Sequence, residues 1–274
     1  MSGRSPRIAL VGAGRVGQSM AAHALAHGAE LRWVLDAAPR GDTSALHAPW
    51  YHVVEEIPRG DVDLCIIAVP DAAIEDAART LAEHGVFEAG TMVFHTSGSR
   101  TSEELHALQE AGMIVGGLHP VQSFSPLPTI TTLQGITCGI EGGDVFEREA
   151  LALATGWSWH GLRIDAAHKA LYHAACVLTG NFPTVLAEIA GEALSVASKD
   201  GLAAPWQAFL PMLHEVLRKL EAAPPAEVLT GPARRGDADT LRRHTDALRE
   251  LSPEAANVYD VLSALILSRN PRTS

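Results

Sequence analysis

The chain has 274 residues, of which 47% are hydrophobic, and its formal net charge is −11. This length and apolar content are enough for two modest domains, each with a buried core. An acidic chain without a run of Lys or Arg is not expected to bind nucleic acid, which requires a basic face.

The three cysteines, Cys65, Cys138 and Cys176, are widely spaced among apolar neighbours, so we expect reduced thiols rather than a disulfide framework. The first strand-like run begins almost at the N-terminus, which leaves no room for a signal peptide. No apolar stretch reaches roughly 18 residues without Gly, Pro or polar interruption, and the segment after Lys169 comes closest. We therefore predict a cytoplasmic protein that contacts neither nucleic acid nor a membrane.

From residue 7 to about residue 164, short β-branched runs alternate with Ala-rich amphipathic stretches. Expected strands are RIALV, LRWVLD, DLCIIAVP, TMVFHT and MIVGGLH, and GITCGI, DVFEREALALATG and WSWHGLRI add a strand, a helix and a strand at the sheet edge. Such alternation predicts a parallel sheet with helices on both faces. Because DLCIIAV is apolar throughout, it is typical of a strand covered on both sides.

The strand signals stop after Asp165. Residues 165–222 predict helices, TGPARRGD a loop, and ADTLRRHTDALREL and PEAANVYDVLSALILSR two more helices. We predict an α/β fold with an N-terminal Rossmann-type, doubly wound, mainly parallel sheet over residues 1–164. A C-terminal all-α domain for substrate binding and dimerisation is predicted over residues 165–274.

The stretch IALVGAGRVG places Gly12, Gly14 and Gly17 in GxGxxG spacing between a strand and a helix. The first glycine permits a tight turn, the second lets the backbone approach a pyrophosphate, and the third lets the helix pack on the strand. The N–H groups of the following helix attract phosphates. The motif predicts dinucleotide binding, with Arg15 and Val16 as further contacts; the alternative is a Gly-rich turn in a domain that binds no nucleotide.

Two residues give opposite indications of whether the cofactor is NAD or NADP. Asp36 ends the second strand, about 20 residues after the motif, and would accept hydrogen bonds from both ribose hydroxyls of NAD. Arg40 would instead hold the 2′-phosphate of NADP. Val69 and Pro70 end a later strand at the sheet's carboxyl edge and are expected cofactor contacts, unless they only terminate the strand.

Lys169 begins the apolar segment HKALYHAACVLTGNFP, in which no other formally charged side chain appears. A partly buried lysine has a depressed pKa and can protonate the oxygen of a carbonyl as it is reduced. The alternative is an ordinary i,i+4 pair with Asp165. His173 lies on the same helical stripe, and Asn181, near the expected kink at Pro183, is a candidate for orienting the substrate.

Two more strand ends and one loop carry candidate residues. Ser97 would bind the nicotinamide amide or the substrate carboxylate, or simply cap the next helix, and His119 would be a second acid or a substrate contact, with Ser123 in the loop beyond. Arg235 or Arg234 would clamp a substrate carboxylate, or Asp237 would cap a helix. Since the thirteen histidines show neither HExxH nor HxH spacing, we expect no metal site.

In order along the chain, VGAGRVG, HTSGS, GLHPVQSF, KALYHAACVLTGNF and LTGPARRGD followed by DTLRRHTDAL resemble the motifs of proteins with a Rossmann-like domain and a DUF2520 domain. That family is similar to the 6-phosphogluconate dehydrogenase-like group, which includes ketopantoate reductases, pyrroline-5-carboxylate reductases and β-hydroxyacid dehydrogenases. The hydroxyacid enzymes carry K-x-x-x-N on this helix; Lys169 matches its lysine, whereas His173 stands where the asparagine is expected. The family pattern favours Arg235, with Asp237 and His244 nearby.

We predict an NAD- or NADP-dependent reductase that transfers hydride to a small 2-oxo acid; the resemblance suggests 2-dehydropantoate (ketopantoate). The alternatives are an imine reductase of the pyrroline-5-carboxylate type and a non-catalytic NAD(P)-binding sensor or assembly protein. The apolar final helix indicates a homodimer, unless this helix is buried within its own chain.

Overall fold

The computed structural model describes residues 5–38, 46–124 and 131–269. It divides into a sheet unit, Met1–Asn181, and a helical unit, Phe182–Ser274. The last strand ends at Arg163, where the strand signals in the sequence stop, but the sheet unit also includes helix α5 (Lys169–Gly180). The domain boundary near residue 164 therefore stays a prediction.

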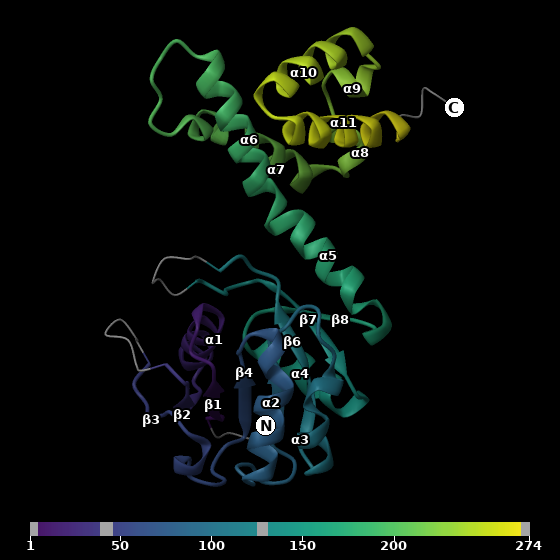
Figure 1. Ribbon diagram of the computed structural model, residues 1–274. Coiled ribbons are helices and arrows are strands. Elements are labelled where there is room, and N and C mark those ends of the chain that lie inside the picture. The colour runs from purple at the N-terminus through teal and green to yellow at the C-terminus, as the bar shows by residue number, and fades with distance from the viewer. Residues whose placement is uncertain (1–4, 39–45, 125–130, 270–274) are drawn as a thin grey trace. The chain divides into compact units, whose positions relative to one another are not determined.

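Among the described residues, eight strands form one sheet in the order β3-β2-β1-β4-β5-β6-β7-β8 (Figure 1), and of these pairs only β7 against β6 is antiparallel. This confirms the predicted mainly parallel, doubly wound sheet. The antiparallel register places Gly139 opposite His119, so the start of β7 lies beside the end of β6. The strands are β1 Arg7–Val11, β2 Glu30–Leu35, β3 Trp50–Tyr51, β4 Leu64–Ile67, β5 Met92–His95, β6 Ile114–Pro120, β7 Thr137–Gly142 and β8 His160–Arg163.

Helices cover both faces of the sheet. Alternate strand residues point to opposite faces, so Leu10 and Ile66 pack in one buried cluster with α1 and α4, whereas Val11 and Cys65 pack in the other with α2 and α3. Strand β4 is buried at every position, as predicted from its continuous apolar run. These helices are α1 Arg15–Ala26, α2 Ile74–Glu83, α3 His106–Glu110 and α4 Asp144–Gly156.

The described part of the helical unit contains helices and no strand. The expected loop TGPARRGD differs in one respect, because Pro232–Arg235 forms a single helical turn, α9. Proline suits the first turn of a helix, and Gly231 and Gly236 adopt positive φ on either side of it. The helices are α6 Phe182–Ala197, α7 Leu210–Ala222, α8 Pro225–Val228, α9 Pro232–Arg235, α10 Ala238–Leu251 and α11 Pro253–Ser268.

The apolar segment after Lys169 forms two consecutive helices. Helix α5 ends at Gly180 and α6 begins at Phe182, where the sequence predicts a break at Pro183. By length and composition, Ala166–Ala197 is the one described helical stretch that is apolar enough to cross a membrane, and 6% of its apolar window is buried. A single such stretch is weak evidence for a membrane span, and its first charged residue pairs with the sheet, as described below.

Candidate functional site

The glycine loop joins β1 to α1 at the carboxyl edge of the sheet. Gly12 has φ of 87°, and a Cβ there would lie 2.7 Å from the Ala68 carbonyl oxygen. A Cβ on Gly17 would collide with the Gly12 carbonyl oxygen, whereas one on Gly14 would meet nothing within 4 Å. Gly12 and Gly17 are thus required by close packing, and Gly14 leaves the backbone open to an approaching group, as dinucleotide binding requires.

Asp36 ties the second strand to this loop. One carboxylate oxygen accepts a hydrogen bond from Ala13 N–H at 2.6 Å, and the other accepts from Ala38 N–H at 2.8 Å. Asp36 also lines a groove of about 850 Å³, the glycine groove, together with Gly12, Gly14, Val69 and Pro70. The structure therefore brings five of the predicted cofactor contacts into one groove.

Not every predicted cofactor contact can be assigned to this groove. Arg15 and Val16 form the first turn of α1 and do not line the glycine groove; Val16 packs against the core instead. Arg40 lies outside the described residues. Because Gly14 precedes α1 without any side-chain cap, the first N–H groups of this helix are available to an anion.

Lys169 is buried more deeply than expected. Its ammonium donates a hydrogen bond to Glu141 Oε2 at 2.8 Å, and each side chain is 3% exposed. Burial lowers the pKa of the Lys169 amine, and the Glu141 carboxylate opposes that shift. The sequence predicts a half-exposed amine or a surface pair with Asp165, and the structure instead has a buried ion pair. The difference arises because β7 places the Glu141 carboxylate within hydrogen-bond distance of the start of α5.

Glu141 is held by more than the lysine. Its carboxylate accepts hydrogen bonds from Ser102 Oγ at 2.8 Å and from Ser102 N–H at 2.9 Å. The Lys169 amine also lies against the α-carbon of Gly117, where a side chain would collide with it. This network joins the start of α5 to β6, β7 and the turn after β5.

His95, at the end of β5, is fully buried, and both of its ring nitrogens have partners. Ser97 N–H donates to Nδ1 at 3.2 Å, so Nε2 carries the hydrogen and donates to the Thr101 carbonyl oxygen at 3.0 Å. Burial, reinforced by the nearby Lys169, lowers the pKa of His95 to about 4. His95 is therefore a neutral structural group rather than a substrate contact.

Ser97 serves the turn that follows β5. Its hydroxyl oxygen accepts hydrogen bonds from Ser99 N–H at 3.2 Å and from Arg100 N–H at 3.1 Å. This is the capping alternative that the sequence left open, and the side chain is 8% exposed. A role for Ser97 in contacting cofactor or substrate stays a prediction.

Two histidine rings lie together where α5 crosses the end of β6. His119 Nδ1 is 2.8 Å from the Tyr172 hydroxyl, and the His119 and His173 rings stack with centroids 5.7 Å apart. Both rings lie against Gly98, whose missing Cβ would be 2.7 Å from His173 Nδ1 and 3.0 Å from His119 Nε2. Burial, with His173 and Lys169 nearby, lowers the pKa of His119 to about 4.

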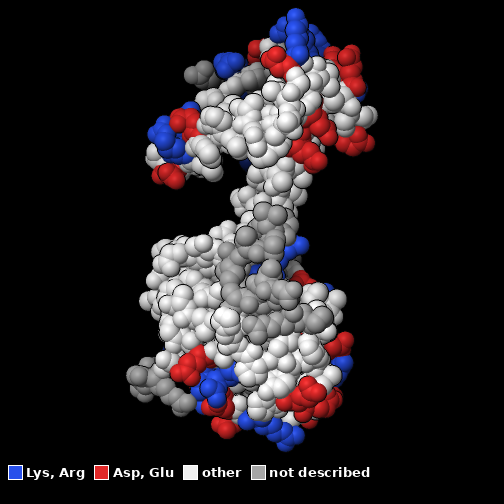
Figure 2. All heavy atoms as spheres, turned by 90° about the vertical axis from the view of Figure 1, so that its left-hand side faces the viewer, with Lys and Arg blue, Asp and Glu red and all other residues white. Residues whose placement is uncertain are grey.

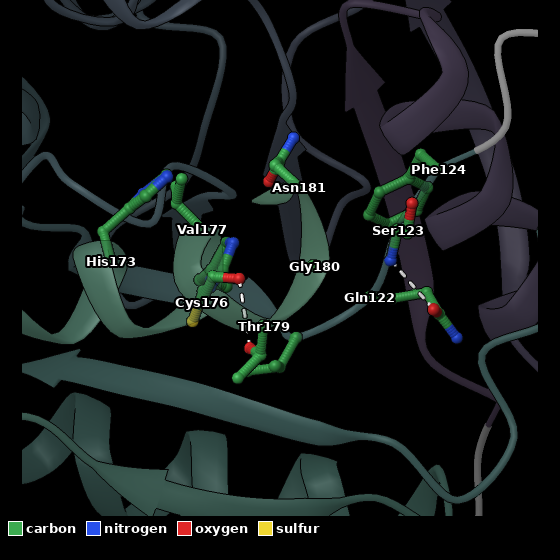
Figure 3. A pocket seen from close by; sticks show the side chains of 11 residues that line it. Gln122, Ser123, Phe124, His173, Cys176, Val177, Thr179, Gly180 and Asn181 are labelled. Carbon is green, nitrogen blue, oxygen red and sulfur yellow. Dashed lines mark hydrogen bonds between the residues drawn. The ribbon is translucent and has the colours of Figure 1, made fainter. Parts of the chain in front are cut away.

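A cavity of about 540 Å³, the imidazole pocket, opens beside these rings. Figure 3 shows His173 and Cys176 on α5, Asn181 directly after its end, and Gln122–Phe124 on the segment that follows β6. Ser123 and Asn181 thus line the same pocket as His119 and His173, whereas Lys169 does not, and the roles of all five in catalysis or substrate binding stay predictions. Its full lining is His119, Val121, Gln122, Ser123, Phe124, His173, Cys176, Val177, Thr179, Gly180 and Asn181, with no Asp or Glu among them.

The predicted substrate contacts of the C-terminal part belong to the helical unit. Arg235 is exposed at the end of α9, and Asp237 accepts a hydrogen bond from Thr240 N–H at 3.1 Å, which caps α10. Hydrogen bonding by Thr240, from its side chain first and then from its backbone N–H, lowers the pKa of Asp237. His244 Nδ1 is 2.7 Å from the Tyr259 hydroxyl. Asp237 thus has the capping role that was its alternative, and substrate contact by Arg235 or Asp237 stays a prediction.

Three residues of this region, Glu141, Tyr172 and Gly98, were not predicted from the sequence. Glu141 has a signal, because it is the one carboxylate next to the apolar strand GITCGI and a buried lysine needs an anionic partner. Tyr172 lies three residues after Lys169, which places both on one side of a helix. Gly98 shows its role only through the two rings packed on it. Among the described residues, no group of three His, Cys, Asp or Glu side chains could hold a metal ion.

Comparison with solved structures supports this fold along nearly the whole chain. A protein of Bacteroides fragilis described as an NADP oxidoreductase is 23% identical, with a TM-score of 0.78 over 96% of this chain and 98% of that one. An imine reductase of Myxococcus stipitatus in complex with NADP+ is 14% identical, with a TM-score of 0.60 over 96% and 92%. Pyrroline carboxylate reductase of Plasmodium falciparum, with NADP bound, is 8% identical, with a TM-score of 0.61 over 97% and 100%.

These identities establish the fold alone. No curated protein matches the sequence. The family model of a Rossmann-like domain matches residues 3–120, and that of DUF2520, a domain of unknown function, matches residues 136–266. The chain therefore combines a Rossmann-like domain with a DUF2520 domain, as its motifs indicate.

Proposed function

We propose that the chain is an NAD(P)-dependent oxidoreductase that transfers hydride to a small 2-oxo acid. The observation that carries this proposal is the pair of cavities at the carboxyl edge of one sheet, where doubly wound folds place their ligands. The glycine groove lies at the ends of β1, β2 and β4, and the imidazole pocket lies at the end of β6. The fold is shared with reductases that bind NAD+ or NADP+.

The residues of the glycine groove fit a dinucleotide. Gly14 and the start of α1 would bind the pyrophosphate, and Asp36 would bind the adenosine ribose. Val69 and Pro70 would contact the cofactor where it runs along the carboxyl edge of the sheet. When bound, the nicotinamide supplies the hydride. Asp36 keeps unused acceptor capacity beyond its two backbone bonds, which favours NAD, while Arg40 in the sequence favours NADP.

The imidazole pocket offers hydrogen bonds to a polar acid. His119, Ser123 and Asn181 supply N–H and O–H groups on its lining. Lys169 remains the sequence-based candidate for the proton donor. One hydrogen of its ammonium is bonded to Glu141 Oε2 at 2.8 Å, which leaves two others for a substrate oxygen. Because the side chain is 3% exposed, α5 would have to move from the sheet for a substrate oxygen to reach the amine.

The test is a panel of 2-oxo acids, including 2-dehydropantoate, and cyclic imine carboxylates, each assayed with NADH and NADPH in parallel. We expect cofactor oxidation with one or more oxo acids, and the ratio of rates with the two cofactors distinguishes the Asp36 and Arg40 cues. Oxidation with none of the acids or imines, despite measurable cofactor binding, contradicts the enzyme proposal.

An imine reductase is the second candidate, and the imine reductase and pyrroline carboxylate reductase folds favour it. It would oxidise cofactor with cyclic imines and not with oxo acids, so the same panel separates the two. A non-catalytic NAD(P)-binding protein would bind cofactor and oxidise it with neither class of acid.

We further propose that the protein acts as a homodimer in the cytoplasm. Much of α5 and α6 is apolar and exposed, including Leu171 at 70% and Val196 at 75%, and on the face drawn in Figure 2 this segment shows little charged surface. The final helix α11 also exposes apolar side chains, among them Val261 at 61%. Exposed apolar surface of this extent marks an interaction site, which supports the subunit contact predicted from the final helix over burial within its own unit.

A further inference from the structure

We propose that the stacked imidazoles of His119 and His173 form the site that binds the substrate's carboxylate group. Tyr172 keeps the hydrogen of the His119 ring on Nε2, from which it can be donated to that carboxylate. This rests on the proposed function, because it names the part of the imidazole pocket that recognises an acid. It adds Tyr172 and Gly98, neither of which the motifs assign to any site.

The chemistry of the pocket lining suits an anion. Each of its polar side chains can donate a hydrogen bond, through imidazole, hydroxyl, amide or thiol groups. A lining without carboxylates repels no anion. The carboxylate of Glu141 is bonded to Lys169 and does not line the pocket.

The contacts of the His119 ring determine which of its nitrogens carries the hydrogen. Burial raises the pKa of the Tyr172 hydroxyl and lowers that of His119, so the tyrosine is protonated and the imidazole neutral. The imidazole nitrogen is a better acceptor than the competing thiol of Cys176, so the Tyr172 hydroxyl donates to His119 Nδ1. The hydrogen of the neutral ring is then on Nε2, which has no hydrogen-bond partner among the described residues.

The second ring, that of His173, has a polar atom without a hydrogen-bond partner among the described residues. This atom, Nδ1, is buried. Most buried polar side-chain atoms in proteins have such a partner. Gly98 is what allows both rings to approach the same point, since a methyl group there would lie 2.7 Å from His173 Nδ1 and 3.0 Å from His119 Nε2. The chain thus packs two polar rings closely where an apolar pair would have been simpler to bury.

Oxamate, a non-reducible analogue of a 2-oxo acid, and uncharged oxamide provide matched probes. Binding to the full-length chain is measured by calorimetry with and without NADPH, so no turnover is needed. We expect oxamate to bind and oxamide not to bind. His119→Gln, whose amide nitrogen reaches the position of Nε2, should retain most of the affinity, whereas His119→Asn should weaken it about tenfold, or about 1.4 kcal/mol.

Gly98→Ala, which displaces both rings, should also weaken oxamate about tenfold without lowering the melting temperature more than the His119 variants do. The role of Tyr172 has a separate readout. In ¹⁵N-histidine-labelled protein, His119 should show a protonated Nε2 and an unprotonated Nδ1, and Tyr172→Phe should give a mixture of tautomers.

Equal binding of oxamate and oxamide, or unchanged oxamate affinity in His119→Asn, overturns the carboxylate site. An Nδ1-protonated His119 overturns the role of Tyr172. If the substrate panel shows no turnover but oxamate binds as described, the proposed function fails and the carboxylate site stands.

Discussion

Lys169 and Glu141 form an ion pair at 2.8 Å in which both side chains are 3% exposed, between the first turn of α5 and strand β7. A buried charge that loses its partner costs about 3–5 kcal/mol, whereas replacing both partners with neutral groups is often tolerated. Glu141→Gln should therefore destabilise the protein by about that amount. The double variant Lys169→Met with Glu141→Gln, which keeps an acceptor for Ser102, should recover most of the loss.

Urea unfolding of the two single variants and the double variant gives the coupling free energy directly. A coupling below about 0.5 kcal/mol contradicts a pair that stabilises the fold. The same variants test the catalytic role of Lys169: with an active substrate in hand, Lys169→Met should lower kcat about 10²-fold or more if the amine is the proton donor. If kcat is unchanged, the lysine only holds α5 against the sheet.

Acid should destabilise the protein through His95. The neutral ring accepts from Ser97 N–H and donates to the Thr101 carbonyl, so protonation of Nδ1 breaks the first bond and places a charge near Lys169. The pKa is about 4 in the folded protein and about 6.5 in the unfolded chain. The folded state thus favours the neutral form, and its contribution is complete above about pH 6.5 and lost as the pH falls toward 4.

Between pH 7 and pH 5 this group alone should lower the free energy of unfolding by on the order of 2 kcal/mol. Urea unfolding at both values measures the loss. His95→Gln, which can still donate to the Thr101 carbonyl, should show a loss smaller by about that amount. The variant and the wild type share the titration of His119, so an identical pH dependence in the two proteins would exclude His95 as the source.

The sequence predicts the sheet well because its signals are local. A continuous apolar run such as β4 and a glycine motif between a strand and a helix each depend on neighbouring residues. The site depends instead on which strands meet. Glu141 lies beneath Lys169 only because β7 pairs antiparallel with β6, and no local pattern fixes that register. The sequence allows Asp237 to be a helix cap or a substrate ligand, and the hydrogen bond that it accepts from Thr240 N–H shows the capping role.

The exposed apolar residues of α5, α6 and α11 lead to a prediction about assembly. If a second copy covers them, size-exclusion chromatography with light scattering should show a dimer of the 29.0 kDa chain. Leu171→Glu and Val261→Glu, at positions 70% and 61% exposed, should shift it toward the monomer. Val145→Glu, on α4 and 47% exposed, is the matched control and should leave the dimer intact. A monomeric wild type at micromolar concentration contradicts the homodimer.

The glycine loop gives a prediction that separates folding from cofactor binding. A methyl group on Gly14 meets nothing within 4 Å, and its φ of −68° suits alanine, so Gly14→Ala should melt close to the wild type. The same methyl group would occupy the open side of the loop, where the pyrophosphate is expected to approach, so the affinity for NADH or NADPH should fall about tenfold or more.

Gly17→Ala should instead lower the stability of the fold. Its methyl group collides with the Gly12 carbonyl oxygen, and overpacking of this kind costs about 1–3 kcal/mol. Thermal unfolding and fluorescence titration of reduced cofactor measure the two effects on each variant. Should Gly14→Ala bind both cofactors as tightly as the wild type, the pyrophosphate does not lie over this loop.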